Sequence, residues 1–261
     1  MKVEVLVSTM DQSDISIVDK MNISGDAVIV NQCDRQFYTE SKHNGRNVRM
    51  YSFNERGVGK SRNNALMRSN ADICLMADDD MVYVDNYEEI VLNAFKENPN
   101  ADMIMFNVPI TKSNGQTLIK VKKNERIHFY NSLKYGTVNI VFKREKIVKA
   151  NVFFSLLFGG GAPYSCGEDS LFITESLKKG IKIYSNTAVI AEIKEGESSW
   201  FTGYNEKYFF DKGVLYAAVS KKMAYLLAFQ FVYRHRKLYE NDHMTPKIAF
   251  NHMIRGIKSF N

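Results

Sequence analysis

The chain alternates short apolar runs with amphipathic segments over most of its length. The apolar runs are bounded by polar loops and are too short for helices, which is typical of buried strands. Expected strands cover residues 3–8, 27–31, 48–53, 73–77, 103–108, 137–142, 182–184 and 188–193. Expected helices cover residues 14–21, 59–69, 87–97, 144–150 and 169–179. This alternation predicts right-handed βαβ units, and therefore an α/β fold with a mainly parallel sheet flanked by helices.

Three adjacent carboxylates follow the apolar run at residues 73–77. Asp78, Asp79 and Asp80 are expected at the carboxyl end of a buried strand, where open α/β sheets bind their ligands. Three like charges repel each other, so a compensating partner is expected. A divalent cation suits this role, because Mg²⁺ and Mn²⁺ prefer oxygen ligands and often bridge a carboxylate to substrate phosphates. The alternative is a solvated acidic turn.

A second stretch imitates a phosphate-binding P-loop at Gly59-Lys60-Ser61. A P-loop requires a glycine five residues before the second glycine, and Asn54 occupies that position. The P-loop interpretation therefore fails. The start of the helix at 59–69 could still receive a phosphate through its free N–H groups, with Lys60 and Arg62 adding positive charge.

Composition and charge divide the chain into two parts. Its 261 residues are 45% hydrophobic and 12% aromatic, which suits one sizeable α/β domain with a C-terminal appendage. Residues 1–202 contain 25 basic and 25 acidic residues, whereas residues 203–261 contain 10 basic and 4 acidic ones. The net charge of +6 therefore lies in the C-terminal segment. Such a segment suggests an anionic partner: nucleic acid, membrane headgroups or a phosphorylated lipid.

Cysteine usage and the apolar runs bear on the compartment. Cys33, Cys74 and Cys166 are scattered and form no CxxC pair. The apolar run at the N-terminus is too short for a signal sequence, and no segment approaches the ~20 apolar residues needed to span a bilayer. These features predict a reducing, cytoplasmic environment.

Five short motifs, taken in order, resemble family 2 glycosyltransferases of the GT-A fold, especially the bacterial members that build cell-surface polysaccharides. The resemblance covers roughly residues 1–200, and the order and spacing of the motifs carry it. The motifs are Val5-Leu6-Val7-Ser8-Thr9, Asp34 after the second strand, the segment from Gly57 to Leu66, Ala77-Asp78-Asp79-Asp80-Met81, and Gly167-Glu168-Asp169-Ser170-Leu171.

The resemblance implies a nucleotide-sugar donor, usually a UDP-sugar, a divalent metal (Mn²⁺ or Mg²⁺) and inversion at the anomeric carbon. A metal between Asp80 and the diphosphate would stabilise the charge on the leaving group. Asp78 would face the ribose or the metal, and Asp79 would support the site. The residues expected around the base, ribose and nucleotide pocket are Ser8, Thr9, Asp34 and Arg62. The alternative for Arg62 is an ordinary surface position on a helix.

Inversion in one displacement needs a general base opposite the leaving group. Asp169 matches the family's base position, and Glu168 is the second candidate, with orientation of the loop or the acceptor as its expected role. The alternative is that both only cap a helix N-terminus, where acidic residues are favoured. The preceding run Gly159-Gly160-Gly161 could let an acceptor approach closely, or could be only a mobile loop.

The sequence departs from the family in lacking a late histidine. Many members supply one near the end of the catalytic domain as a metal or phosphate contact, whereas residues 191–200 contain none. Glu192 could substitute, or the third protein ligand is missing. Trp200 could stack on a sugar or close the core. None of the five histidines has ligand spacing.

The domain expectation is a catalytic domain at residues 1–202, with a nucleotide-sugar half at about 1–110 and an acceptor half at about 111–202, followed by a basic, aromatic, helical tail at 203–261. The tail contains a short apolar run, residues 223–233, between clusters of Lys and Arg. Such a run could lie in a membrane interface or pack on the catalytic domain. A lipid-linked acceptor, such as a polyprenyl-diphosphate glycan at the inner face of the plasma membrane, favours the first role.

The leading hypothesis is therefore an inverting hexosyl- or N-acetylhexosaminyl-transferase that extends a cell-surface glycan. A nucleotidyltransferase of sugar metabolism is the second enzyme class, because it can share such a sheet and acidic metal site. It would have no need for Glu168-Asp169 as a base. The third class is a non-catalytic sugar- or nucleic-acid-binding protein. Such a module would have little use for three clustered carboxylates, so nucleic acid is not expected as a partner.

Overall fold

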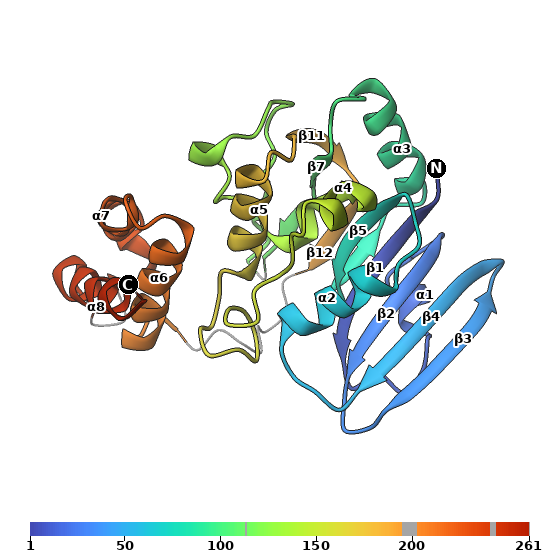
Figure 1. Cartoon of the computed structure of the whole chain (residues 1–261), viewed down its shortest axis with the longest axis horizontal. Coiled ribbons are helices and arrows are strands. Elements are labelled where there is room, and N and C mark those ends of the chain that lie inside the picture. The colour runs from blue at the N-terminus through green and yellow to red at the C-terminus, as the bar shows by residue number, and fades with distance from the viewer. Residues whose placement is uncertain (113, 195–202, 241–243, 261) are drawn as a thin grey trace.

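An eight-stranded mixed sheet forms the centre of the computed structural model, which describes residues 1–112, 114–194, 203–240 and 244–260 (Figure 1). The strand order is β11-β7-β10-β5-β1-β2-β4-β3. The strands are β1 (Val3–Met10), β2 (Asp26–Gln32), β3 (Phe37–His43), β4 (Arg46–Phe53), β5 (Ile73–Asp78), β7 (Met103–Asn107), β10 (Ile140–Lys143) and β11 (Ile183–Val189). Neighbours pair in parallel except at β10 and β3, which run antiparallel to their partners. The predicted α/β fold with a mainly parallel sheet is confirmed.

A smaller four-stranded sheet adjoins the carboxyl end of β5. Its strands are β6 (Met81–Tyr83), β12 (Ala191–Lys194), β8 (Ile110–Thr111) and β9 (Thr117–Leu118), in that order. Only Asp79 and Asp80 separate β5 from β6, so the chain leaves the large sheet and enters the small one within a two-residue turn. The acidic triplet therefore lies where the two sheets meet.

Helices cover both faces of the large sheet because successive side chains of its strands point to opposite faces. On β1, Val5 and Val7 join the core under α3 (Tyr87–Glu97), whereas Leu6 joins the core on the other face. That second core also contains apolar side chains from the helices α2 (Val58–Arg68), α4 (Arg144–Lys149) and α5 (Glu168–Lys178). The short helix α1 (Ile17–Lys20) adds to the α3 side.

The C-terminal helices form a separate unit with its own core, on the far side of α5 from the sheet (Figure 1). They are α6 (Glu206–Val219), α7 (Ala224–Arg234) and α8 (Pro246–Phe260). Two glycines bring α6 and α8 together backbone to backbone. A Cβ on Gly213 would lie 2.1 Å from the Met253 carbonyl oxygen, and one on Gly256 would lie 2.1 Å from that of Phe210. The expected helical tail is confirmed; its expected start falls beside residues 195–202, which are outside the described residues.

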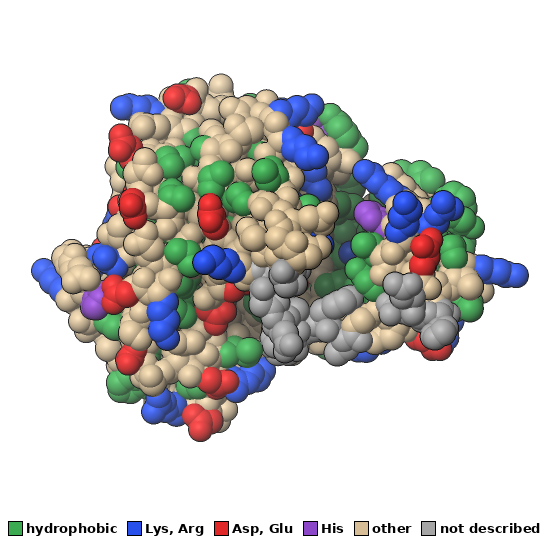
Figure 2. Space-filling model, turned by 180° about the vertical axis from the view of Figure 1, so that it is seen from behind, with side chains coloured by type: hydrophobic (Ala, Val, Ile, Leu, Met, Phe, Trp, Pro, Cys, Tyr) green, Lys and Arg blue, Asp and Glu red, His purple; other side chains and the backbone are tan. Residues whose placement is uncertain are grey.

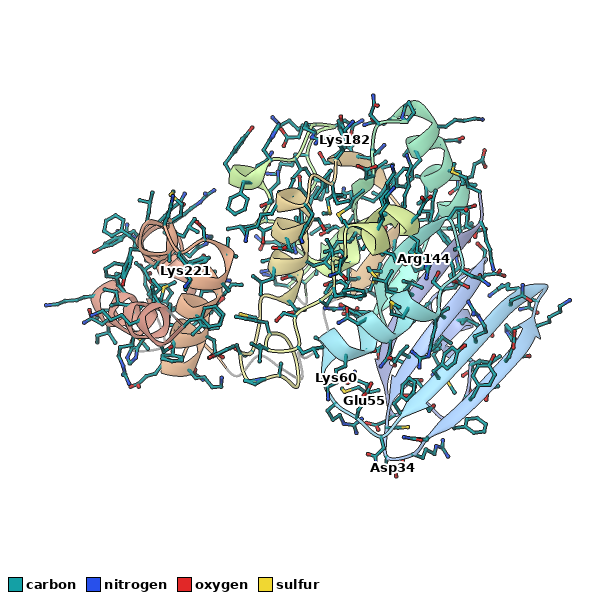
Figure 3. All side chains as sticks on the ribbon, viewed as in Figure 1. Asp34, Glu55, Lys60, Arg144, Lys182 and Lys221 are labelled. Atoms are coloured by element: carbon teal, nitrogen blue, oxygen red, sulfur yellow. The ribbon has the colours of Figure 1, made fainter. Side chains whose placement is uncertain are left out.

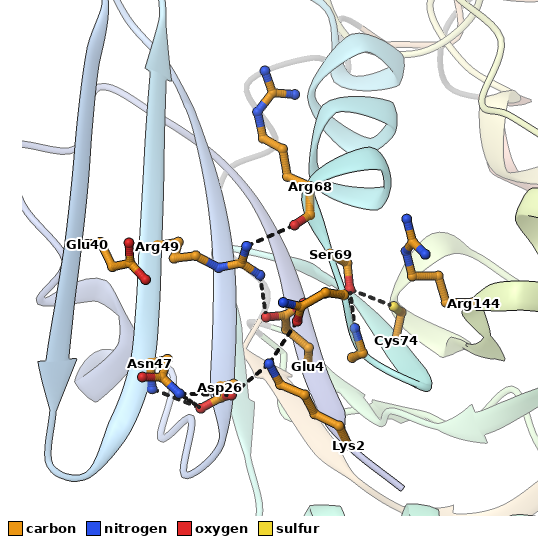
Figure 4. Close-up of polar contacts among 12 residues, drawn as sticks. Lys2, Glu4, Asp26, Glu40, Asn47, Arg49, Arg68, Ser69, Cys74 and Arg144 are labelled. Carbon is orange, nitrogen blue, oxygen red and sulfur yellow. Dashed lines mark hydrogen bonds and ion pairs between the residues drawn. The ribbon is translucent and has the colours of Figure 1, made fainter.

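A polar network locks the amino end of the sheet (Figure 4). The buried Glu4 carboxylate accepts hydrogen bonds from Arg49 at 2.7 Å and from the Ser69 hydroxyl at 2.6 Å. Arg49 also donates to the Arg68 carbonyl at 3.0 Å, which ties β4 to the end of α2. Because both oxygens of Glu4 are satisfied, this buried charge is part of the fold and lies at the opposite end of β1 from the acidic triplet.

Two of the differences from the expected elements have a clear physical reason. Strand β3 was not anticipated, because as an edge strand it exposes side chains on both faces and shows no apolar period. The expected strand at 137–142 begins only at Ile140. Residues Thr137–Asn139 form a 3-10 turn instead, which the Asn139 side chain holds by accepting from the Gly136 N–H at 3.1 Å and donating to the Phe106 carbonyl at 2.9 Å.

Candidate active site

A cavity of about 800 Å³ opens at the carboxyl ends of β1, β2 and β5. Its wall also includes the start of α5, the end of β12 and one residue of α6. Eight of the nine residues expected in the site line it: Ser8, Thr9, Arg62, Asp78, Asp79, Asp80, Glu168 and Asp169. Asp34 is the exception. Segments far apart in the sequence are therefore brought to one cavity, as the position of ligands in open α/β sheets predicts.

The three adjacent aspartates have different partners. Thr9 donates its hydroxyl to Asp79 at 2.6 Å, and Arg62 donates to Asp78 at 2.8 Å. Among the described residues, no side chain pairs with Asp80. Desolvation within the cavity, together with the charges of Asp78 and Asp79, raises the pKa of Asp80 to about 6. Asp80 is thus the carboxylate that is free to bind a cation.

Arg62 lies in the interior and joins two parts of the site. Its side chain is 4% exposed, and its guanidinium donates to Glu168 at 2.6 Å as well as to Asp78 at 2.8 Å. Burial opposes its charge, but the two carboxylates outweigh burial and raise the pKa of Arg62. The alternative that Arg62 occupies an ordinary surface position on a helix is wrong. Its expected support of the nucleotide pocket stays a prediction.

The structure gives Glu168 and Asp169 different partners. Glu168 is committed to the Arg62 ion pair, and burial raises its pKa, with Asp169 adding to the effect and Arg62 opposing it. Asp169 accepts the N–H of Ser170 through Oδ1 at 2.6 Å, while its Oδ2 points to the space beside Gly136. A Cβ on Gly136 would lie 3.6 Å from that oxygen. Asp169 therefore presents a carboxylate oxygen to the cavity, as a general base must.

Four buried polar atoms of cavity-lining residues have no hydrogen-bond partner among the described residues: Ser8 Oγ, Gln32 Oε1, Arg62 Nε and Tyr135 Oη. A buried polar group without a partner is costly, so such atoms at a cavity wall mark where a polar ligand would bind. Sequence reasoning missed Gln32. Its one signal was a weak one, namely a place at the end of a buried strand, two residues before Asp34.

Asp34 lies elsewhere. It is exposed in the loop after β2, at the lower edge of the sheet in Figure 3, and does not line the cavity. Its expected contact with base or ribose stays a prediction, whereas Gln32 occupies the cavity wall at the end of the same strand.

The start of α2 is covered by the loop at residues 155–160, which occupies the place where a phosphate was expected to bind. Val58 donates its N–H to the Gly160 carbonyl at 2.9 Å, and a Cβ on Gly59 would lie 2.3 Å from the Ser155 carbonyl oxygen. A Cβ on Gly159, at φ +100°, would lie 2.6 Å from Val58 and 2.8 Å from Glu168. The glycine run therefore makes room for α2 and Glu168. Lys60 does not line the cavity (Figure 3).

A divalent cation is compatible with this carboxylate set, although protein groups alone would not complete its coordination. Within the described ranges, no three His, Cys, Asp or Glu side chains are grouped closely enough to hold a metal ion. Mg²⁺ sites that serve phosphate chemistry usually combine one or two carboxylates with substrate oxygens. Asp80, with Asp78 beside it, fits that pattern. Glu192 does not line the cavity, whereas its neighbours Ile193 and Lys194 do; Trp200 lies outside the described residues.

The open, mainly parallel sheet with carboxylates at its carboxyl edge and at the start of a following helix matches a GT-A-like fold, which the solved structures below share. Residues 28–157 match the family described as Glycosyl transferase family 2. This segment contains the acidic triplet and Arg62 and ends before Glu168. No protein of curated function matches the chain in sequence.

Solved structures with the same fold include those of TarS from S. aureus. TarS 1-349 in complex with UDP-GlcNAc aligns with a TM-score of 0.62 and 15% identity, over 84% of this chain and 66% of that one. TarS 1-349 in complex with UDP aligns with a TM-score of 0.59 and 14% identity, over 84% and 65%. For the longer S. aureus TarS chain the values are 0.60 and 15%, over 83% and 39%. The chain thus spans just under two thirds of TarS 1-349.

Proposed function

We propose that this protein is an inverting glycosyltransferase that moves a sugar from a nucleotide-sugar, with a UDP-sugar as the expected donor, to a glycan acceptor. The observation that carries the proposal is one cavity lined by both Asp80, which has no side-chain partner among the described residues, and Asp169, whose Oδ2 borders the space beside Gly136. The family match over residues 28–157 supports it, as do the TarS structures in complex with UDP-GlcNAc and UDP.

The chain's own residues supply the base and the shape of the donor site. An acceptor hydroxyl beside Gly136 gives its proton to Asp169 Oδ2 while its oxygen forms a bond to the anomeric carbon. The bond from that carbon to the diphosphate breaks, and the electron pair leaves with the nucleotide. Arg62 holds Asp78 and Glu168 in place, so that the donor wall and the loop that carries Asp169 stay in register.

A bound Mn²⁺ or Mg²⁺ would supply charge stabilisation for the leaving diphosphate. Asp80, with Asp78, would hold it together with the donor's oxygens. Ser8 Oγ and Gln32 Oε1 would hydrogen-bond to the nucleotide, which gives their buried polar atoms the partners they lack.

A lipid-linked acceptor at an anionic membrane surface fits the C-terminal unit. No helix among the described residues is long and apolar enough to cross a bilayer. Helix α7 nevertheless exposes large apolar side chains, each between 44% and 57% exposed: Tyr225, Leu226, Phe229 and Tyr233. Exposed basic residues flank them: Lys221, Lys222, Arg234, Arg236 and Lys237. We call this set the α7 surface; green and blue side chains lie side by side on this lobe in Figure 2.

The test is release of UDP from a panel of UDP-sugars with Mn²⁺, in the wild type and in Asp169→Asn. The variant is nearly isosteric but cannot accept the proton, so we expect kcat to fall by roughly 10²–10⁴ while UDP affinity changes little. An active Asp169→Asn together with an inactive Glu168→Gln would reverse the assignment. Release of pyrophosphate from a nucleoside triphosphate, with no UDP release, would favour the nucleotidyltransferase instead.

A further inference from the structure

The C-terminal unit contributes one side chain to the cavity. Lys212 of α6 lines the same cavity as Asp169, although it lies outside the family match and is far from the acidic triplet in sequence. The family resemblance covers roughly residues 1–200, so it did not predict that a lysine of the C-terminal unit would line the cavity.

Two contacts next to Lys212 fix α6 against the loop that leads to Asp169. The buried Asp211 carboxylate accepts from the Ser165 N–H at 2.9 Å and from its hydroxyl at 2.8 Å. A Cβ on Gly167 would lie 2.5 Å from Leu215, so the loop and α6 touch directly there. Because one contact precedes Lys212 and the other lies about one turn after it, the position of Lys212 relative to Asp169 is set by the fold.

The Lys212 ammonium has no hydrogen bond or ion pair among the described residues. It lies 5.2 Å from the centre of the Phe231 ring and 5.9 Å from that of Tyr216. Burial opposes its charge, but Tyr216, Cys166 and Asp169 outweigh burial and raise the pKa of Lys212. The ammonium therefore lies near two aromatic rings and has no hydrogen-bond acceptor among the described residues.

A second lysine, Lys120, borders the space beside Asp169. A Cβ on Gly136 would lie 3.4 Å from Lys120 Nζ and 3.6 Å from Asp169 Oδ2, so the ammonium and the carboxylate border the same small space. Lys120 also has no ion pair among the described residues. Of the other two cavity lysines, Lys134 is engaged by Glu125 at 3.6 Å, and Lys194 is exposed at the end of β12.

We propose that Lys212 and Lys120 form an anion subsite for the acceptor, so that the sugar is received by an alcohol carrying a phosphate or carboxylate group near its reacting hydroxyl. This inference rests on the proposed function, because it assigns the space beside Asp169 to the acceptor. Helix α6 contacts the loop just before Asp169 through Ser165 and Gly167, which places Lys212 on the Asp169 side of the cavity and favours the acceptor over the donor diphosphate.

The test measures binding of a simple anion to the full chain already loaded with UDP and Mg²⁺. Inorganic phosphate and acetate are titrated in separate arms at constant ionic strength, by calorimetry. We expect millimolar binding that persists at saturating UDP, and a Kd raised by roughly 10–100-fold in Lys212→Met, as expected for losing a charged hydrogen bond. The preferred arm identifies the acceptor's anionic group. Lys212→Arg should recover most of the affinity, because arginine keeps the charge and stacks on aromatic rings.

The matched control is Lys247→Met, which removes an exposed lysine from α8 of the same unit and should leave the Kd of the anion within about twofold. Absence of anion binding in the UDP-loaded wild type would overturn the inference. So would competition between phosphate and UDP, which would place Lys212 in the donor site, or equal affinities in Lys212→Met and Lys247→Met. Failure of UDP itself to bind would instead count against the proposed function.

Discussion

At the scale of single residues, the site depends on how the positive charge of Arg62 is shared between two carboxylates. Arg62 neutralises Asp78 and Glu168 together, Thr9 holds Asp79, and Asp80 is left over. The three aspartates look equivalent in the sequence. In the structure, Asp78 and Asp79 have side-chain partners, whereas Asp80 has none among the described residues.

Arg62→Met should destabilise the fold, because it leaves Asp78 and Glu168 without their shared partner. Breaking a buried ion pair costs roughly 3–5 kcal/mol, and we expect the lower end, since Asp78 is 35% exposed. Urea denaturation gives the loss. The matched control is Arg56→Met, whose ion pair with Asp11 is exposed and should contribute less than about 1 kcal/mol. Equal losses in the two variants would show that the bridge does not support the fold.

The pKa of Asp80 predicts how metal-dependent UDP binding responds to pH. With this pKa raised to about 6, the carboxylate is protonated below that pH and cannot bind a cation. Affinity for UDP in the presence of Mn²⁺ should therefore be constant above pH 7 and fall toward pH 5. Calorimetry across this range tests the expectation, with Asp80→Asn expected to be weak throughout. A flat profile in the wild type would mean that Asp80 is not the ligand.

At the scale of elements, the start of α5 is held between the sheet and α6. Arg62 contacts Glu168 from one side, and Leu215 packs against Gly167 from the other. The position of Asp169 therefore depends on both units of the molecule.

Gly167→Ala should be more destabilising than an ordinary glycine substitution. Gly167 has φ +113°, and its Cβ would lie 2.5 Å from Leu215, whereas Gly180 has φ +82° with no atom within 4 Å of its Cβ. Gly180→Ala is thus the control for backbone strain of about 1–2 kcal/mol. We expect Gly167→Ala to lose at least about 1 kcal/mol more, from overpacking, with reduced turnover. Equal stability losses by urea denaturation would mean that the loop moves away from α6 freely.

At the scale of the whole molecule, charge and apolar area coincide on the C-terminal unit. The core of that unit uses one side of α7, including Ala228 and Val232, and leaves Leu226 and Phe229 of the α7 surface in solvent. An interfacial helix needs such an apolar stripe beside basic residues.

We expect the protein to sediment with anionic vesicles at low salt and to be released at high salt, because each Lys or Arg near such a surface contributes about 1 kcal/mol that salt weakens. Replacing the five basic residues of the α7 surface by Gln should abolish sedimentation and spare UDP binding. Lys247→Gln, on α8 of the same unit, is the single-site control. If the wild type does not sediment with anionic vesicles at low salt, or if the quintuple variant unfolds, the predicted membrane role is wrong.

The success of prediction from the sequence differs from element to element. The helix at residues 87–97 was predicted to the residue, because its apolar face repeats at the helical period and Asn98-Pro99 ends it. Strand β3 was not predicted, because an exposed edge strand needs no apolar face. In the site, the aspartates were found from their place behind a buried strand. Gln32 was not, because a single polar residue at a strand end carries no distinctive pattern.

The sequence by itself determined the class of fold, the acidic turn and the location of the net charge, since each depends on residues close together along the chain. Only the tertiary structure decided which carboxylate is free, because Arg62 reaches its partners 16 and 106 residues away. It also decided that Lys212 joins the cavity, since that depends on α6 packing against the loop before Asp169. Local patterns specify elements, whereas the pairing of charges is settled by the distances that packing creates.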